Sequence, residues 1–490
     1  MTSSKSTKRA LITSALAILM CAAMLIGTTF AWFTDTASTG VNKIVSGNLK
    51  VDIIGADSDS HIEKLNFTKA ATTDAEAGAE ILWEPGCRYL TEGFRIANKG
   101  NLALKWKAQV NTGTTAANEG NFDLLDVIDF YLVTKAADGT ETETALDEFT
   151  GNLKKTETSD VYYIKGVMQT TAGNDYQGLT LDGITITVVA TQDTVENDSF
   201  NNQYDKDAEY PILVTTGDEL QAIVSNATAP VNIVLTNSIT TNNFVIPEDK
   251  DVTLDLNGRT VTNAGSHTIL NKGHLTLTDS STDKSGQIIS LKGNTAALRN
   301  GDNAVCVVEG GTISRDGANG NTWHVVENFG KMTFNGGKVV LKNGNGFAIT
   351  NGWNYFDPGA STTHAVMEIN ALELDTDSSG IKNCRYGDLT VNDATVTSTG
   401  YWALSNDYLG TAVINGGTLT SNSFKAVSNG AAMTVNGGTF DGTEGLFVQS
   451  YATSTVLNGG TFTNMNVDAL SSYVGTGHTA QQSGTSVIIK

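Results

Sequence analysis

Glycine pairs that follow an asparagine or an acidic residue divide the second half of the chain into nearly regular steps. Measured at the second glycine, the steps are 26, 80, 21 and 22 residues. The long step divides into 34, 23 and 23 residues if Asn370-Ala371 and Asp393-Ala394 are degenerate copies. A β-rich repeat of this length is one turn of a solenoid. The pairs are Glu309-Gly310-Gly311, Asn335-Gly336-Gly337, Asn415-Gly416-Gly417, Asn436-Gly437-Gly438 and Asn458-Gly459-Gly460.

A series of asparagines runs out of phase with the glycine pairs. Five of its members precede a repeat marker by 9 or 11 residues, so each coil has two fixed corners. Stacked coils would superimpose these side chains, and their amides could then hydrogen-bond along the axis. Glycine permits positive φ at the other corner. The sequence therefore predicts an internal asparagine ladder made of Asn271, Asn300, Asn328, Asn351, Asn383, Asn406 and Asn429.

The repeat favours a right-handed parallel β-helix of roughly ten coils over residues 206–490. Leucine-rich repeats share the period, but the LxxLxL core that they need is missing. Residues 220–224 together with 252–258 resemble the first coils of pectate-lyase-like β-helices. Residues 201–209 are polar and are interpreted as a linker.

The first half of the chain also has sequence patterns that are typical of β-strands. A length of 490 residues is too great for one hydrophobic core, so at least two domains are expected. Residues 48–53 and 102–108 alternate between apolar and polar, and 127–133 and 184–190 are apolar stretches. Short strands without a helical period indicate a β-sandwich or jelly roll. The expected fold class is therefore all-β, with this domain followed by the β-helix.

The N-terminus has the three-part layout of an export signal. Lys5, Lys8 and Arg9 precede an apolar run over residues 10–26, which is near the lower length limit of a membrane span. Small residues around position 29 predict cleavage between Ala31 and Trp32 by a signal peptidase. The alternative is a short membrane anchor. Because no second long apolar stretch follows, the mature chain is expected to have no transmembrane segment.

Several short motifs carry a resemblance to a known family. Residues 27–35 (GTTFAWFTD) and 46–49 (SGNL) resemble the start of TasA and camelysin family proteins, which a SipW-type signal peptidase processes. The segments 83–86 (WEPG), 94–100 (FRIANKG) and 190–200 are similar to later parts of that family and occur in the same order. The resemblance covers roughly residues 8–205.

This resemblance implies an extracellular jelly roll over residues 32–205, located in biofilm fibres or on the cell surface. In fibre-forming members an N-terminal strand completes the sheet of the next subunit, and strand addition of this kind satisfies unpaired backbone groups at a sheet edge. The candidate donor is 36–48, and the alternative is that this segment pairs within its own domain.

Charge and cysteine content exclude several function classes. A net charge of −21 opposes binding to nucleic acids and anionic lipid surfaces. Camelysins have been classed with metallopeptidases, but the sequence has no HExxH motif, so we expect neither a metal nor another cofactor. Once the signal has removed Cys21, the three remaining cysteines cannot all pair. Cys306 and Cys384 are interpreted as small buried residues, and Cys87 is the third.

An insertion and recurrent aromatic residues suggest a binding surface. Asn351 lies 20 residues before its marker, and the surplus falls near residues 353–359. Insertions of this kind often build binding sites. Aromatic faces that are exposed could stack on sugar rings, whereas the alternative is that they pack inside the coils or cap the turns. The candidate glycan-binding residues are Trp353, Tyr355, Asp357, Trp402 and Tyr408.

Catalytic chemistry has weaker support. A glycoside hydrolase needs converging carboxylates, and a polysaccharide lyase needs acids for calcium and a base. Asp357, Asp388 and Asp407 lie in neighbouring coils near Arg385, but isolated acids on turns are usually only solvated. We therefore assign no catalytic residue. The leading hypothesis is an extracellular structural or adhesive protein that self-associates and binds polysaccharide, and the alternative is a secreted polysaccharide lyase or glycoside hydrolase.

Overall fold

The computed structural model describes residues 48–490 apart from 63–64, 69–80, 82, 112–113, 116–121, 147–148, 180, 183–184, 194–208, 264, 318–322 and 354–361. The expected signal, its cleavage site at Ala31 and Trp32, and residues 36–47 of the candidate donor segment therefore lie outside the described residues. Across the described ranges, none of the helices combines the length and the apolar character needed to cross a membrane.

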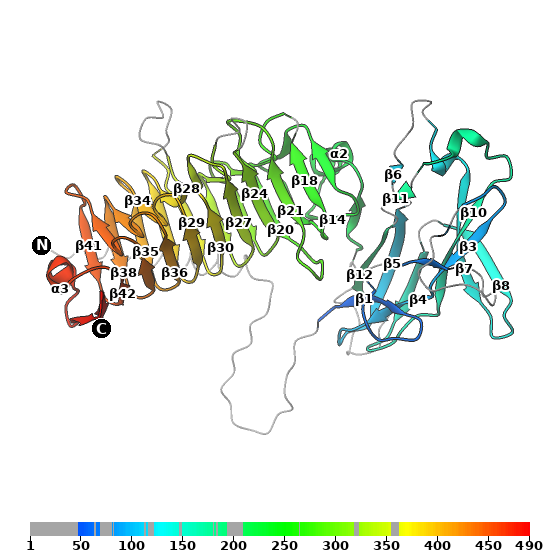
Figure 1. Cartoon of the computed structure of the whole chain (residues 1–490), viewed down its shortest axis with the longest axis horizontal. Coiled ribbons are helices and arrows are strands. Elements are labelled where there is room, and N and C mark those ends of the chain that lie inside the picture. The colour runs from blue at the N-terminus through cyan, green and yellow to red at the C-terminus, as the bar shows by residue number, and fades with distance from the viewer. Residues whose placement is uncertain are drawn as a thin grey trace, which may run out of the picture. The chain divides into compact units, whose positions relative to one another are not determined.

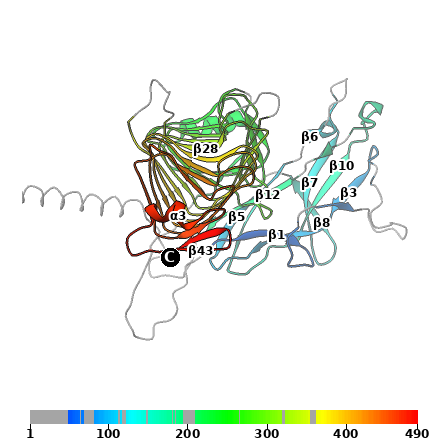
Figure 2. The same ribbon diagram turned by 60° about the vertical axis from the view of Figure 1, so that its left-hand side comes forward.

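Residues 212–462 form a parallel β-solenoid of about ten turns, which confirms the predicted β-helix and its approximate coil number. Figure 1 shows the coils stacked in chain order from green to red, and Figure 2 shows them one behind another. Each regular coil gives one strand to each of three sheets, here named sheets I, II and III. Successive coils pair in register, as Asn300 with Asn328 illustrates.

Sheet I consists, in the described part of the chain, of eleven parallel strands. They are β13 (Ile212–Val214), β14 (Val231–Leu235), β17 (Asp251–Asp255), β20 (His274–Thr278), β23 (Val305–Val308), β26 (Lys331–Phe334), β29 (Ala365–Ile369), β32 (Gly387–Val391), β35 (Thr411–Ile414), β38 (Ala432–Val435) and β41 (Ser454–Leu457).

Sheet II adds, among the described residues, ten parallel strands and an antiparallel hairpin of β44 (Ser486–Ile489) and β43 (Ala480–Ser483). The parallel strands are β15 (Ile239–Thr241), β18 (Thr260–Asn263), β21 (Gln287–Ser290), β24 (Thr312–Asp316), β27 (Lys338–Lys342), β30 (Glu373–Thr376), β33 (Thr395–Ser398), β36 (Thr418–Ser421), β39 (Thr439–Asp441) and β42 (Gly460–Phe462).

Sheet III has nine parallel strands within the described ranges. They are β16 (Phe244–Ile246), β19 (Ile269–Asn271), β22 (Leu298–Asn300), β25 (Val326–Asn328), β28 (Phe347–Asn351), β31 (Ser379–Asn383), β34 (Leu404–Asn406), β37 (Val427–Asn429) and β40 (Leu446–Val448).

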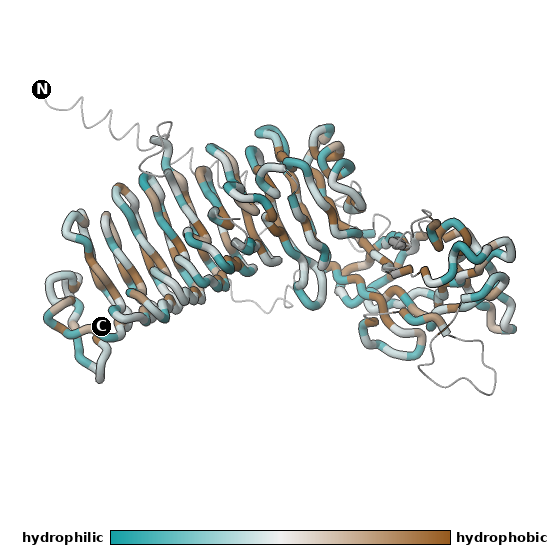
Figure 3. Tube along the Cα trace, turned by 45° about the horizontal axis from the view of Figure 1, so that its top comes forward, coloured by the Kyte–Doolittle hydropathy of each residue, from teal (hydrophilic) through white to brown (hydrophobic). Residues whose placement is uncertain are grey.

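The inside of the coils is one continuous hydrophobic cluster. It extends from Val214 in β13 to Ile489 in β44. Strands such as β20 alternate exposed and buried residues because successive side chains point to opposite faces. The apolar, brown segments recur from coil to coil in Figure 3. Burial of these columns is the main source of solenoid stability.

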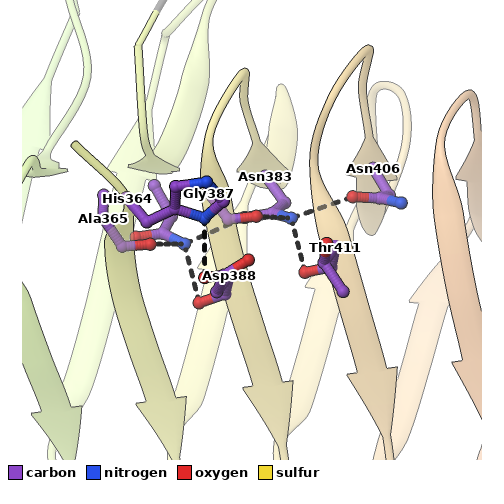
Figure 4. Close-up of polar contacts among 8 residues, drawn as sticks. His364, Ala365, Asn383, Gly387, Asp388, Asn406 and Thr411 are labelled. Carbon is purple, nitrogen blue, oxygen red and sulfur yellow. Dashed lines mark hydrogen bonds and ion pairs between the residues drawn. The ribbon is translucent and has the colours of Figure 1, made fainter. Parts of the chain in front are cut away.

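The seven asparagines of the expected ladder lie in one column at the corner between sheets III and I, and each is at most 1% exposed. From Asn271 to Asn406, each Nδ2 donates to Oδ1 of the asparagine in the next coil, over 2.7–2.9 Å, and Nδ2 of the last member, Asn429, donates to Ser454 O and Thr455 Oγ1. Nδ2 also donates to a sheet I carbonyl, as Asn383 does to Thr411 (Figure 4) and as Asn406 does to Ala432. This inner ladder therefore satisfies its buried amides along its length.

A second, outer ladder occupies the corner between sheets I and II. Here each Nδ2 donates toward the preceding coil, over 2.7–2.9 Å, and Asn335 donates to Oε1 of Glu309. The asparagine before each glycine pair belongs to this ladder, which the sequence analysis did not predict. Its members are Asn335, Asn370, Asn392, Asn415, Asn436 and Asn458.

The glycine pairs close the same corner. The second glycine of each pair has φ between +86° and +111°, a region that a side chain disfavours. One degenerate marker was misplaced by a residue. Because Lys338 pairs with Glu373, Gly337 aligns with Leu372 and not with Ala371. Leu372 is buried and packs into the core, so a hydrophobic contact replaces the glycine turn at this coil.

Both ends of the solenoid are capped. The cap at the N-terminal end was not predicted, because residues 220–224 were expected to belong to the first coils. Residues 220–224 do not form part of a coil but lie in helix α2 (Gly217–Asn226), which the Thr216 side chain caps. Leu220 and Val224, one turn apart, cover the first coil, and Gln221 bonds both backbone groups of Val245. At the other end α3 (Val467–Leu470), η4 (Ser471–Tyr473) and the β43–β44 hairpin cover the core.

The described residues before 194 form antiparallel sheets. One sheet contains β1 (Val51–Gly55), β2 (Phe67–Thr68), β3 (Arg88–Thr91), β4 (Phe94–Asn98), β7 (Ile128–Lys135), β8 (Glu141–Ala145) and β10 (Tyr162–Met168). Another contains β5 (Leu104–Asn111), β9 (Phe149–Leu153) and β12 (Thr185–Gln192), and a third pairs β6 (Thr114–Thr115) with β11 (Leu181–Asp182). Short 3-10 turns are η1 (Leu124–Asp126) and η2 (Asn174–Tyr176).

The first two of these sheets share a core. Phe94 and Ile96 in β4 pack in one cluster with Leu104 and Trp106 in β5. Four segments expected from their apolar pattern fall in β1, β5, β7 and β12. All-β architecture is therefore present on both sides of residues 194–208, while the specific jelly-roll topology stays a prediction.

The inner ladder should carry more stability than the outer one. In the variant Asn406→Ala, Asn383 loses a buried acceptor and Asn429 loses a buried donor. At about 1–3 kcal/mol for each buried group that loses a partner, we expect a loss of about 2–6 kcal/mol. The matched control is Asn415→Ala in the exposed outer ladder, for which we expect a loss of about 1 kcal/mol or less. Urea unfolding of the β-helix, followed by circular dichroism, measures both, and equal losses would contradict this assignment.

Candidate functional site

The outer face of sheet III gathers charged and aromatic side chains. The residue immediately before each inner-ladder asparagine faces outward on this sheet, because the asparagine itself faces inward. These outward residues are Leu270, Arg299, Glu327, Thr350, Lys382, Ser405 and Ser428. In a chain of net charge −21, cations on this face need a specific explanation.

The first charged group on this face is centred on Arg299. Its Nη1 lies 3.0 Å from Oε2 of Glu327, and its guanidinium lies 4.5 Å from the centre of the Phe329 ring. Nε1 of Trp323 donates to the other Glu327 oxygen over 3.0 Å. Glu327 is only 3% exposed, and these donors satisfy both of its carboxylate oxygens.

The same combination of cation, carboxylate and aromatic ring occurs twice more. Lys382 Nζ lies 3.2 Å from Asp407 and 5.4 Å from the centre of the Phe347 ring. Lys425 Nζ lies 3.0 Å from Glu444 and 3.5 Å from the centre of the Phe447 ring. The charged triads are defined here as Arg299/Glu327/Phe329, Lys382/Asp407/Phe347 and Lys425/Glu444/Phe447. The three are spaced along sheet III from β22 to β40.

Further aromatic residues border sheet III on both sides. At the corner with sheet II, Trp402 packs edge-on against Phe424 at 4.7 Å and stacks with Phe447 at 6.1 Å. At the corner with sheet I, Tyr408 and Tyr451 are 45% and 54% exposed. The Arg299 and Lys382 side chains thus project from the strands of sheet III, the Lys425–Glu444 pair lies at the corner with sheet II in the same column as Trp402, and aromatic residues lie along both margins.

The structure separates the predicted glycan-binding residues. Trp402 and Tyr408 lie on opposite margins of sheet III. Trp353 is only 8% exposed, because it packs on Phe329 at 4.5 Å, so its ring is mostly covered. Its Nε1 has no hydrogen-bond partner among the described residues. Tyr355 and Asp357 lie outside the described residues.

The acids considered for catalysis are also separated by their pairing. Asp407 belongs to a charged triad, whereas Asp388 Oδ2 lies 2.8 Å from Nδ1 of His364 (Figure 4). The His364 ring lies 5.6 Å from Tyr386, whose hydroxyl accepts a hydrogen bond from Arg385. The side chains of His364 and Asp388 are 52% and 41% exposed. This pair is a solvated surface contact, and desolvation contributes little to its reactivity.

A hollow of about 550 Å³ lies elsewhere, over sheet II, and Glu373, Asp375 and Asp393 are among its lining residues. Glu373 pairs with Lys338, and Asp375 lies 2.9 Å from Lys342. No ring covers either lysine in the described structure, which distinguishes these pairs from the charged triads. No cluster of three potential metal ligands occurs in the described ranges.

Sequence reasoning missed the cations of sheet III. The outward position on sheet III is fixed relative to the inner asparagine and not relative to the glycine pairs. The signal was available, since the residue before each ladder asparagine identifies Arg299, Glu327 and Lys382 directly. Lys425 and Phe447 could be found only from the register of β37 and β40.

The comparisons leave the chain without a family assignment. No family model, curated protein or solved structure matches it. The sheet III face is therefore interpreted from its own geometry. The aromatic rings and charged pairs on this face are suited to binding a ligand through stacking and hydrogen bonds.

Two histidines beside this face make stability depend on pH. Burial lowers the pKa of His267 and His324, although the Glu327 charge opposes the shift. The N–H of Ala296 donates to Nδ1 of His267 over 2.8 Å, which keeps that nitrogen unprotonated. Since the unfolded chain takes up protons near pH 6.5, the stabilisation is present above that pH and is lost as the pH falls below it.

We expect the urea midpoint of the β-helix to fall between pH 7.5 and pH 5.5. The double variant His267→Asn/His324→Asn should flatten this dependence, while His274→Asn, a change at an exposed position, should leave it unchanged. Urea titrations at a series of pH values measure the slope. An unchanged slope in the double variant would show that other groups cause the dependence.

Proposed function

We propose that the chain is exported and acts at the cell surface or in a biofilm matrix as a structural and adhesive protein. Its TasA-like part would assemble, and its β-helix would be displayed and would bind polysaccharide on sheet III. The single observation that carries the binding role is the row of three charged triads along sheet III, beside aromatic residues at both of its margins. Rigid stacked coils hold these groups without a mobile loop, so little entropy is lost on binding.

The assembly role rests on the resemblance and on the described N-terminal sheets. The 83–86 segment ends in a turn at Pro85 and Gly86, and Phe94–Asn98 is strand β4. In the described residues β8 and β9 lie at sheet edges, where a further strand could add. The solenoid is capped at both ends, so end-to-end growth is disfavoured there. A jelly roll that accepts a donor strand is therefore the proposed route to polymers, after a signal peptidase has released the chain.

The alternative enzymatic function has one arrangement in its favour, which is the His364–Asp388 pair beside Tyr386 and Arg385. We do not propose it. Both members of the pair are solvent-exposed, and Asp407 is paired with Lys382 instead of converging on them.

Aromatic residues on sheet III should control polysaccharide binding. The change Trp402→Ala removes a ring from one margin, and Tyr408→Ala removes one from the other. At about 1–1.5 kcal/mol for each lost stacking contact, we expect each to weaken binding roughly five- to tenfold. Affinity electrophoresis of the full secreted chain in gels that contain soluble glycans measures this. The control is Val366→Ala on the outer face of sheet I, which should bind as the native chain does.

If no polysaccharide retards the native chain, the proposed binding role is wrong. Retardation that both aromatic variants retain in full would place the ligand on another surface.

Assembly should depend on the segment before β1. We expect the mature chain from Trp32 onward to form polymers whose size increases with concentration. Replacement of residues 36–48 by a glycine- and serine-rich segment of equal length keeps the spacing but removes the strand-forming side chains, and should yield monomers. Light scattering after size-exclusion chromatography measures both. The assembly proposal fails if the native chain stays monomeric at every concentration, or if the replaced chain polymerises equally.

A further inference from the structure

We infer that the polysaccharide bound on sheet III is an uncharged, hydroxyl-rich polymer and not a polyuronate. The inference rests on the proposed binding function and adds the chemical class of the ligand. It derives from the charges of the described residues on this face.

The cations of the charged triads are all matched by carboxylates. Arg299, Lys382 and Lys425 lie 3.0, 3.2 and 3.0 Å from Glu327, Asp407 and Glu444 respectively. Three positive and three negative groups leave these triads with no net charge. The triads therefore offer hydrogen-bonding atoms without an excess of either charge.

A polyuronate would meet a penalty at the two lysine triads. Its carboxylates could reach a cation only by approaching the protein carboxylate about 3 Å from that cation, and like charges at such distances repel. Asp407 and Glu444 are 37% and 43% exposed, so they face the incoming ligand. The net charge of −21 adds a long-range repulsion that salt only partly screens.

A neutral polysaccharide has the complementary groups. Each of its hydroxyls both donates and accepts hydrogen bonds, so it can bond the spare N–H groups of a lysine and the spare lone pairs of its carboxylate at once. Lys382 and Lys425 keep 24% and 21% of their side chains exposed, which leaves donors accessible. The apolar faces of sugar rings can stack on Trp402 and Tyr408 at the margins.

The extent of the row indicates a polymer. From β22 to β40 the chain makes six strand-to-strand steps within sheet III. At ~4.8 Å for each step, the triads span about 29 Å. Because a single sugar ring would contact one triad at most, a linear chain of several rings is the ligand that uses all three.

The test compares neutral and charged polysaccharides on the full secreted chain. A soluble β-glucan and a galactomannan are the neutral probes, and polygalacturonate and alginate are the charged probes, each at low and at moderate salt. We expect retardation by at least one neutral probe, with little salt dependence, and none by the charged probes. Lys425→Ala should weaken neutral binding about fivefold, or about 1 kcal/mol. Its matched control is Lys338→Ala, which removes a paired lysine without a ring on sheet II and should change nothing.

A variant without two of the triad carboxylates tests whether the face can gain affinity for a polyanion. The double change Asp407→Asn/Glu444→Gln leaves Lys382 and Lys425 without their carboxylates, so the face becomes positive. We expect this variant to bind polygalacturonate, in a salt-sensitive manner, while it still binds the neutral probe.

The possible failures are distinct. If the native chain binds a charged probe as tightly as a neutral one, or more tightly, the inference is overturned while the binding function stands. If the double variant gains no affinity for polygalacturonate, charge pairing is not what excludes polyanions. If none of the four polymers is bound, both the inference and the proposed binding role fail, while the assembly role stands or falls by its own test.

Discussion

The buried amide ladder is the constraint on which the rest of the β-helix depends. An asparagine amide enclosed at the corner between sheets III and I is tolerated only when its donors and acceptor are satisfied. The coil above and the coil below supply those partners, so consecutive coils must keep one register at this corner. The outward residue before each asparagine is thereby fixed as well. For this reason Arg299, Glu327 and Lys382 fall on one face although more than 80 residues separate the first from the last.

The two ladders run in opposite directions. Inner amides donate toward the C-terminal end and outer amides toward the N-terminal end, where the outer ladder finishes on the Glu309 carboxylate. Hydrogen-bonded amides in a chain polarise one another, so each ladder gains from its length, and their opposed dipoles partly cancel. Together with the caps formed by α2 and the C-terminal hairpin, these ladders make a rigid closed scaffold. Such a scaffold suits the display of a fixed surface, and its sheet III face is where the chain places its charged triads.

The sequence was sufficient to predict the β-helix because coil corners impose strict residue requirements. Glycine at positive φ and asparagine at the inner corner recur at nearly constant intervals, although the other residues of the coils vary. Prediction was less accurate where a coil departs from the rule. Leu372 replaces a glycine turn by a core contact, so its marker was placed one residue too early, and residues 220–224 form a capping helix because an end coil has no neighbour to pair with.

The binding face was only partly predictable for a different reason. Spacing gives the register of a residue but not the direction or the packing of its side chain. Trp353 lies at a corner that could expose it, yet it packs on Phe329 of the preceding coil. Lys425 and Glu444 likewise belong to two successive coils, so their pairing cannot be predicted from any single segment of the sequence.

Hydrogen exchange of asparagine side-chain amides tests the central claim most directly. With nitrogen-15 introduced only at asparagine, magnetic resonance can follow each Nδ2 group as deuterium replaces its protons. The account predicts slow exchange for the seven inner asparagines, limited by opening of the coils, and fast exchange for the exposed amides of the outer ladder. Inner amides that exchange as quickly as the outer ones would contradict a buried, continuously bonded ladder and the fixed outer face that depends on it.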